Sequence, residues 1–236
     1  MSGVIQAKFM GRFGNQLHEY AACRKYAEIV GAKLEVPDWD GRHIFGLSDP
    51  GWSCELPERD GDTPGSFVWG ETDIRLVGYF QSQRWIGLLR RSELRQWLAV
   101  RRELIDACSI RDGLYVAAHL RQGDYVGNPF YANVPLRSYV RACAEHGLAG
   151  VDRWVAQDSP HDVRGLPQFL PDFVTLMRAS TLLRANSTFS WWAAALGDAD
   201  VYAPVVTDHV GEYAADFVRG NWPRCMRAAD DLRLPD

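Results

Sequence analysis

Apolar residues along the chain occur in two patterns: short runs typical of buried strands, and longer stretches with the three- to four-residue spacing of amphipathic helices. Residues 4–9 alternate like a strand and lead through a Gly-containing loop into a stretch of the second kind. The apolar face of that predicted helix consists of Leu17, Tyr20, Cys23, Ala27 and Val30. Gly31 ends the helix, and a second strand is expected over residues 33–36. The start of the chain therefore predicts a strand–loop–helix–strand unit.

The same two patterns continue as far as residue 205. Further strands are expected over residues 74–80, 114–118, 153–157 and 200–204, and in a short apolar run that begins at Thr181. Further helices are expected over residues 85–108, 136–147 and 173–177, and in the Ala/Trp stretch that Gly197 closes. Residues 37–70 are rich in Gly, Pro, Asp and Trp and have no sustained period, so we expect loops there.

Strands that alternate with helices predict parallel sheets and an α/β fold. The pattern breaks near residues 109–113, which places a boundary between two Rossmann-like lobes. We expect an N-terminal lobe over residues 1–108 and a second lobe over residues 109–205, with a central cleft between them. The polar tail, residues 206–236, is expected to pack back on the first lobe.

Composition narrows the class of protein. The chain has 236 residues, of which 47% are hydrophobic, and a formal net charge of −4, which argues against a nucleic-acid partner. It contains no run of 18 apolar residues and no basic-then-apolar start, so neither a transmembrane segment nor a signal peptide is expected. The five cysteines and six histidines are scattered, so we expect no metal site, no disulfide framework and a cytoplasmic location.

A hydroxyl-rich corner separates the apolar run at Thr181 from the helix that Gly197 closes. Its residues are Asn186, Ser187, Thr188, Phe189 and Ser190. A helix start has unpaired N–H groups and the positive end of the macrodipole, so it attracts phosphate or carboxylate groups. By itself the corner favours an ordinary capped helix, and the pair Trp191-Trp192 favours core packing.

One basic residue and one acidic residue follow two other predicted strands. Arg121 comes just after the strand over residues 114–118, where α/β folds bind ligands, and a guanidinium can hold two phosphate oxygens. The alternative is a surface ion pair between Arg121 and Asp124. Asp158 ends the next strand, where it is either a ligand contact or a turn-capping residue.

Two of these segments resemble known enzymes. Asn-Ser-Thr-Phe-Ser-Trp-Trp-Ala-Ala, residues 186–194, resembles the C-terminal signature of the α-1,2-fucosyltransferase family, and so does Gly-Tyr-Phe-Gln-Ser at residues 78–82. The segment from His119 to Asp124 resembles the His-x-Arg-x-Gly-Asp donor motif of fucosyltransferases. Most α-1,2 members have a second Arg at the position of Gln122, whereas protein O-fucosyltransferases also have a single Arg.

The loop after the first strand carries a fourth resemblance. Gly-Arg-Phe-Gly-Asn-Gln, residues 11–16, resembles a loop of protein O-fucosyltransferases and also the Gly-x-Gly-Asn-Gln turn of the α-1,2 enzymes. After Leu17 those relatives have an aromatic residue and an amide, where this chain has His18 and Glu19. The resembling segments span residues 9–205 and leave residues 37–70 uncovered.

The resemblance implies a glycosyltransferase-B type fold and transfer of L-fucose from GDP-fucose to a hydroxyl of an oligosaccharide or other glycan acceptor, with α-1,2 linkage and inversion. GDP-fucose is then a co-substrate, and neither a cofactor nor a metal is expected. The implied donor-binding residues are His119, Arg121, Asp158, Asn186, Ser187, Thr188, Phe189 and Ser190. The implied catalytic residues are Arg12, Asn15 and Asp124, and the implied acceptor-side residues are Gly14, Gln16 and His18.

Several alternatives stay open. The acceptor can instead be a protein, as for the protein O-fucosyltransferases, and the donor can be another GDP-sugar. Gln122 and the single acid at Asp158, where relatives have two, also fit a GDP-sugar-binding protein that has lost catalysis. A dinucleotide-dependent oxidoreductase is a further alternative, although Gly11 and Gly14 do not make the Gly-x-Gly-x-x-Gly pattern.

Overall fold

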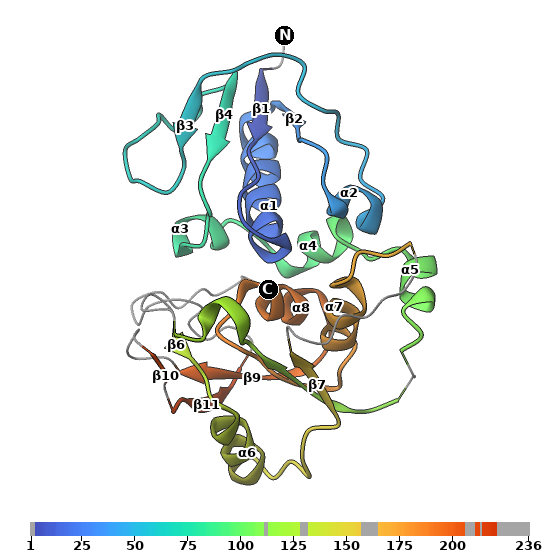
Figure 1. Ribbon diagram of the computed structural model, residues 1–236. Helices are drawn as coiled ribbons and strands as arrows, with labels where there is room; N and C mark the ends of the chain where they lie inside the picture. Colours follow the sequence, from blue (N-terminus) through green and yellow to red (C-terminus); the bar gives the residue numbers. More distant parts are fainter. Residues whose placement is uncertain are drawn as a thin grey trace. The chain divides into compact units, whose positions relative to one another are not determined.

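The computed structural model describes residues 3–110, 113–127, 132–156, 165–205, 211–212 and 214–220. Its internal contacts divide the chain into two units, one ending at Val100 and the other beginning at Arg101. Each unit has its own sheet of wholly or mainly parallel strands, which confirms the α/β class expected from the sequence (Figure 1). The division lies before helix α5 (Arg102–Ala107), whereas the sequence pattern placed it just after that helix.

The first unit contains a four-stranded sheet of parallel strands. Their order is β2 (Lys33–Glu35), β1 (Val4–Ala7), β4 (Ile74–Val77) and β3 (Glu58–Asp60). Helix α1 (Phe13–Val30) connects β1 to β2, and the face predicted from Leu17, Tyr20 and Cys23 is buried. Gly31 ends α1 with a φ of +68°, a conformation that favours glycine.

Parts of the first unit differ from the expectation. Residues 37–70 contain helix α2 (Asp40–Phe45) and strand β3 besides loops. Strand β3 has the sequence Glu-Arg-Asp and no apolar side chain, so its place at the sheet edge depends on backbone hydrogen bonds that no hydrophobic pattern reveals. The long helical stretch expected after residue 85 is divided into α3 (Gln83–Ile86), α4 (Arg91–Trp97) and α5.

The second unit contains a five-stranded sheet. Its order is β11 (Asp216–Arg219), β9 (Asp200–Val205), β8 (Thr181–Leu183), β5 (Val116–Leu120) and β7 (Arg153–Ala156), with only β11 antiparallel. The helices are α6 (Leu136–Glu145), α7 (Leu170–Met177) and α8 (Thr188–Leu196), with a short 3₁₀ turn, η1 (Gly123–Tyr125), after β5. Strands β6 (Ala132–Asn133) and β10 (Gly211–Glu212) form a separate parallel pair. Figure 1 shows α6 on one face of the large sheet and α7 and α8 on the other.

Both faces of this sheet are packed. On the α6 side, Tyr139 is buried with Leu183 and Phe217 in one apolar cluster. On the opposite side, Trp191 and Trp192 are completely buried, with their ring centroids 5.1 Å apart. The tryptophan pair is therefore core packing, in which each large side chain contributes roughly 1.5–3 kcal/mol of burial free energy.

Two boundaries in the second unit differ from the expectation. Strand β5 begins at Val116 rather than at Leu114, whose side chain is 93% exposed. Residues 216–219, expected in a tail that returns to the first lobe, instead pair with β9 in the second sheet. This strand is identified by its pairing partner rather than by a pattern of its own, because its four residues, Asp-Phe-Val-Arg, do not alternate between apolar and polar. Residues 221–236 lie outside the described part of the chain.

Candidate functional site

The topology of the second sheet marks one position for a ligand. The chain runs from β5 outward to β7 and then returns to β8 on the other side of β5. Open α/β sheets bind ligands at the carboxyl ends of the strands where the order reverses in this way, here β5 and β8. These two strands pair through Ala118 and Leu183, so the next residues, His119 and Arg184, are neighbours at that edge.

Helix α8 begins at this edge. Its N-cap is Ser187, with φ −151° and ψ 137°, and the Ser187 hydroxyl oxygen accepts a hydrogen bond of 3.3 Å from the Phe189 N–H. The capped helix start expected from the sequence is confirmed. The Ser190 hydroxyl is buried and donates to the carbonyls of Ala185 and Ser187, both at 3.3 Å. Ser190, expected to bind a ligand, therefore closes the corner in this structure.

Two buried polar atoms at the same edge point to a ligand. The Asn186 side-chain oxygen and the His119 Nδ1 have no hydrogen-bond partner among the residues that the structure describes. Both side chains are buried. Because buried polar groups are nearly always hydrogen-bonded, atoms of this kind next to a helix start are suited to a polar ligand.

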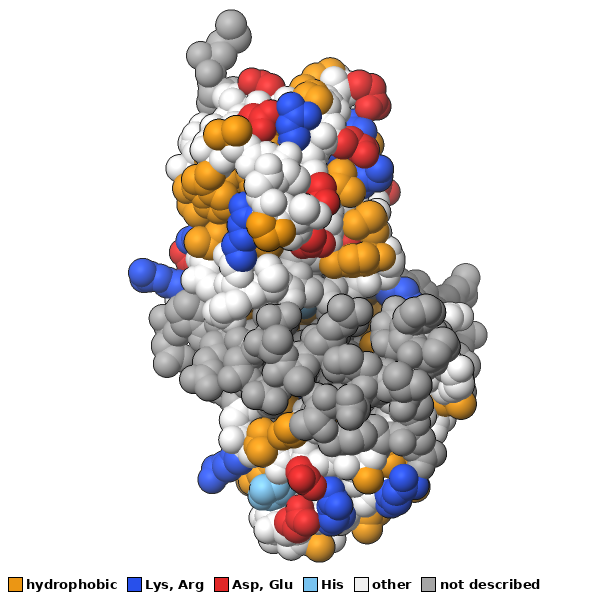
Figure 2. Space-filling model, turned by 90° about the vertical axis from the view of Figure 1, so that its left-hand side faces the viewer, with side chains coloured by type: hydrophobic (Ala, Val, Ile, Leu, Met, Phe, Trp, Pro, Cys, Tyr) orange, Lys and Arg blue, Asp and Glu red, His pale blue; other side chains and the backbone are white. Residues whose placement is uncertain are grey.

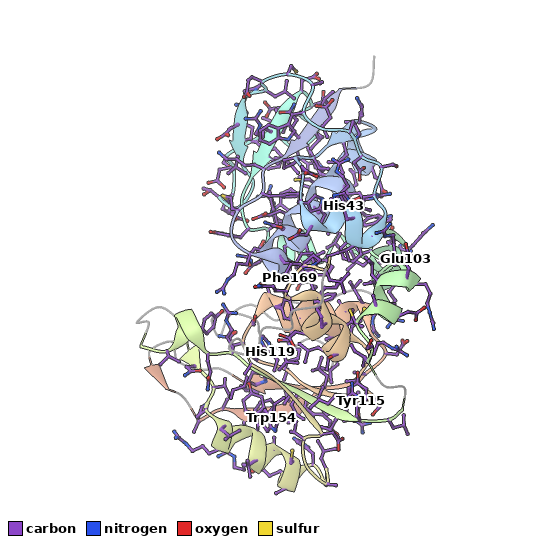
Figure 3. The ribbon with its side chains drawn as sticks, turned by 45° about the vertical axis from the view of Figure 1, so that its right-hand side comes forward. His43, Glu103, Tyr115, His119, Trp154 and Phe169 are labelled. Atoms are coloured by element: carbon purple, nitrogen blue, oxygen red, sulfur yellow. The ribbon has the colours of Figure 1, made fainter. Side chains whose placement is uncertain are left out.

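His119 is held as a neutral imidazole. Burial, together with the positive charges of Arg121 and Arg184, lowers the pKa of His119 to about 3. Its ring lies 5.6 Å from that of Phe189, and the Tyr139 hydroxyl donates a 2.7 Å hydrogen bond to its backbone carbonyl. Figure 3 shows His119 and Tyr115 toward opposite ends of β5.

Two arginines therefore act on this edge. Arg121 follows β5 directly, and its guanidinium carbon lies 4.8 Å from the ring centroid of Tyr125. Arg184 follows β8 directly and is 0% exposed. Sequence reasoning chose Arg121 but missed Arg184, although the same signal, an arginine just after an apolar strand, was present in Thr-Leu-Leu-Arg-Ala.

The structure describes fewer contacts for the other residues expected at this site. Thr188 is the first residue of α8. Phe189 packs against Phe173, with ring centroids 5.3 Å apart, and forms an aromatic wall beside His119. The backbone of Asp124 lies in η1, but its side chain lies outside the described residues, as does all of Asp158.

The loop expected to face the sugar follows β1 in the first unit. Arg12 is the exposed N-cap of α1, and the Asn15 side-chain oxygen accepts a 3.1 Å hydrogen bond from the Gln81 amide. The Gln16 amide donates to the Gly11 carbonyl at 3.3 Å. Gly11 has a φ of +66°, and a Cβ there would displace the Asn15 side-chain amide, so this turn favours glycine.

Two side chains after this loop turn inward. His18 and Glu19 are both buried in α1, as is the backbone position Gly14. Burial lowers the pKa of His18 to about 3, so this histidine is neutral. Because the His18 side chain is enclosed, the structure gives no support to the acceptor contact expected of it. Glu19 accepts a 2.8 Å hydrogen bond from the Met10 N–H and so fixes the start of the loop.

Glu19 makes the stability of the fold dependent on pH. Burial raises the pKa of Glu19 to about 8, a value that includes a smaller lowering by the hydrogen bond from Met10 and a smaller raising by the negative charge of Asp62. A carboxyl whose folded pKa lies above its unfolded value stabilises the fold most at low pH. This stabilisation is lost as the pH rises from the ordinary value of 4.5 toward 8.

We expect Glu19→Gln to remove this pH dependence, because the amide still accepts the Met10 hydrogen bond but cannot ionise. The melting temperature of the variant should exceed that of the wild type above pH 8, and the difference should shrink toward pH 5. Differential scanning calorimetry between pH 5 and 9 measures it, with Glu28→Gln, an exposed carboxylate on the same helix, as the control. Parallel pH curves for wild type and Glu19→Gln would contradict the assignment.

No protein-family model and no curated protein matches the sequence. Solved structures match the fold. The NodZ α-1,6-fucosyltransferase soaked with GDP-fucose matches with a TM-score of 0.55 and 14% identity, over 93% of this chain and 100% of that one. Fucosyltransferase NodZ from Bradyrhizobium gives a TM-score of 0.58 at 13% identity, over 93% and 99% of the two chains.

A more distant structure shares the same fold. A variant of Arabidopsis thaliana FUT1 in complex with GDP matches with a TM-score of 0.53 and 10% identity, over 92% of this chain and 74% of that chain. At these identities the likeness concerns the fold. The two Rossmann-like units are therefore of the glycosyltransferase-B type.

Neither a metal cluster nor a membrane-crossing helix is found in the part of the chain that the structure describes. Within those ranges, no group of three or more His, Cys, Asp or Glu side chains is placed to hold a metal ion. None of the helices described there is both long and apolar enough to cross a membrane.

Proposed function

We propose that this protein transfers L-fucose from GDP-fucose to a hydroxyl of a glycan acceptor, with inversion at the anomeric carbon. The observation that carries the proposal is the carboxyl edge of β5 and β8, where a capped helix start, Arg121 and two buried polar atoms meet at the reversal of strand order. The likeness in fold to NodZ soaked with GDP-fucose and to FUT1 in complex with GDP supports the choice of donor.

The charge at this edge suits a departing diphosphate. When the bond to fucose breaks, negative charge develops on the phosphates of GDP and has to be stabilised by fixed positive groups. We assign that stabilisation to Arg121, which follows β5, and to the N–H groups at the start of α8, with Ser187 and Thr188. The charge of Arg184 adds to the potential at this edge, where burial keeps the effective dielectric low.

The neutral His119 adds a polar group without adding charge. Its unpartnered Nδ1 can donate to or accept from the nucleotide, depending on the tautomer. Asn186 and Asp158 are the remaining side chains that we assign to the donor.

Most of the residues that we assign to catalysis and to the acceptor belong to the first unit. We assign catalytic roles to Arg12 and Asn15, which belong to the loop after β1, and place Gln16 beside the acceptor. Asp124 either removes the proton of the acceptor hydroxyl or holds Arg121. We propose an α-1,2 linkage because of the signature at residues 186–194, whereas NodZ is an α-1,6 enzyme.

A nucleotide panel followed by a turnover assay tests the function. GDP should raise the melting temperature more than UDP, ADP or NAD, and GDP-fucose should then be consumed in the presence of glycan acceptors. Greater stabilisation by NAD would favour an oxidoreductase. Binding of GDP without consumption of GDP-fucose would instead identify a binding protein that has lost catalysis.

We expect turnover to continue in EDTA. Arg121 and the start of α8 supply the positive charge that a divalent cation supplies in other transferases. Initial rates with and without an excess of EDTA should agree within about twofold. Activity that disappears in EDTA and returns with Mn²⁺ or Mg²⁺ would contradict this.

A further inference from the structure

A cavity of about 660 Å³ opens between the edge strand and the aromatic side chains of the first unit. It is lined by Arg59 and by residues 65–71, part of the segment between β3 and β4. One wall is apolar, with Val68 76% exposed and Trp69 44% exposed. The other wall is polar, because the Arg59 guanidinium and the Glu71 carboxylate form an ion pair of 2.8 Å.

The indole of Trp69 is held in a fixed position by an aromatic cluster beneath it. The Tyr26 ring lies 5.0 Å from the Trp69 ring at 74°, and the buried Trp85 ring lies 5.8 Å away. The guanidinium carbon of Arg84 lies 5.9 Å from the Trp69 ring centroid. The Tyr26 hydroxyl also accepts the Gly70 N–H at 3.0 Å, which fixes the backbone next to the indole.

Core packing explains only part of this cluster. Phe67 and Trp85 are buried and serve the core, but Trp69 leaves almost half of its surface in water beside the exposed Val68. Figure 2 looks onto this side of the first unit and shows hydrophobic side chains gathered next to Lys, Arg, Asp and Glu. An apolar surface of this kind, bordered by polar groups, is typical of a ligand-binding position.

The chemistry of the two walls favours a neutral sugar ring. A pyranose has a flat face of C–H groups, which stacks on an exposed indole, and an edge of hydroxyls, which bond to a guanidinium and a carboxylate. The two charged residues that line the cavity, Arg59 and Glu71, have opposite charges that cancel. The lining residues themselves therefore offer a phosphate or a carboxylate no net positive charge, and the nearby Arg84 guanidinium already packs against the Trp69 ring.

One short segment links this cavity to the loop assigned to catalysis. Gln81 holds the side chain of Asn15, and Arg84, in α3 just beyond it, packs on Trp69. Gln81 and Arg84 are three positions apart, so their Cα atoms are at most about 11 Å from each other, and one short segment of the first unit contacts both features.

We propose that residues 65–71, with Arg59, form a subsite for a neutral sugar ring of the acceptor glycan, and that Trp69 is its stacking platform. The role of this subsite in binding an acceptor rests on the proposed fucosyl transfer, but glycan binding there does not require turnover. Residues 37–70, which no resemblance covers, then contain the part of the chain that selects the acceptor.

The test compares Trp69→Ala with a matched control, Trp154→Ala. Trp154 is 41% exposed, lies on β7 in the second unit and packs edge-on against Tyr139 at 5.7 Å (Figure 3). The full-length protein is first screened on a glycan array to choose the oligosaccharide it binds best, and that oligosaccharide is titrated against each variant. Trp69→Ala should weaken its binding at least tenfold, Trp69→Phe should restore most of it, and Trp154→Ala should leave it unchanged.

Kinetic measurements distinguish the subsite from the donor site. In Trp69→Ala the KM for the acceptor should rise at least tenfold, while the KM for GDP-fucose and its hydrolysis without acceptor stay unchanged. Equal acceptor binding in Trp69→Ala and wild type, or no glycan binding by the wild type, would overturn the subsite. Glycan binding that depends on Trp69 but comes without any consumption of GDP-fucose would keep the subsite and reject the proposed function.

Discussion

Arg121→Ala is expected to raise the dissociation constant for GDP by roughly 30- to 700-fold, which corresponds to about 2–4 kcal/mol for a lost charge-assisted pair of hydrogen bonds. The residue follows β5 directly at the edge where the strand order reverses, and its charge acts on His119 in the same place. Arg121 packs over Tyr125 and is only half-buried as a residue, so truncation should leave the fold intact.

Arg153→Ala is the matched control for this measurement. Its guanidinium carbon also packs over a tyrosine, 4.0 Å from the ring centroid of Tyr115, but Arg153 begins β7 and so lies at the amino edge of the sheet. Isothermal titration calorimetry with GDP should show a loss for Arg121→Ala and none for Arg153→Ala. An unchanged dissociation constant in Arg121→Ala would remove the donor site from this edge.

Local rules were enough to predict much of this site. The start of α8 could be read from a hydroxyl-rich corner before good helix formers, since N-cap preferences act within three residues. The buried face of α1 followed from the spacing of Leu17, Tyr20 and Cys23. Arg121 could be chosen because it directly follows a buried apolar strand, the position at which open α/β sheets bind ligands.

Features that depend on contacts distant in sequence could not be predicted in this way. Strand β3 has no apolar side chain, and the position of β11 is defined by its pairing with β9. His119 and Arg184 are neighbours because of the register between β5 and β8, which no local pattern specifies. His18 follows the loop directly, and only the packing of α1 shows that its side chain is enclosed.

The register between β5 and β8 also affects how the departure from the donor motif at Gln122 is interpreted. Most α-1,2 relatives have a second arginine where this chain has Gln122. In the folded chain a second positive charge acts on His119 together with Arg121, and it comes from Arg184 on the neighbouring strand. The loss of an arginine from the motif therefore does not leave this edge with a single cation, which weakens the inference that the motif has decayed.

Asp124→Asn is expected to lower kcat by roughly a hundredfold and also to weaken GDP binding. Asp124 stands three residues after Arg121, in the 3₁₀ turn η1, so both belong to one short loop at the carboxyl end of β5. If the Asp124 carboxylate pairs with Arg121, it is held in its charged form and makes a weak base, so we expect Asp124 to position the arginine rather than to remove the proton. If Asp124 positions Arg121, the arginine loses its orientation and both binding and turnover suffer.

The two constants together distinguish the two roles. A general base would leave the dissociation constant of GDP unchanged and reduce only kcat, whereas a positioning residue changes both. Asp200→Asn is the control, because Asp200 begins β9 at the opposite edge and forms an exposed ion pair of 2.8 Å with Arg219. Wild-type values of both constants in Asp124→Asn would exclude Asp124 from the site. Another group would then have to accept the proton of the acceptor hydroxyl, and the loop that contains Asn15 would be the first place to search for it.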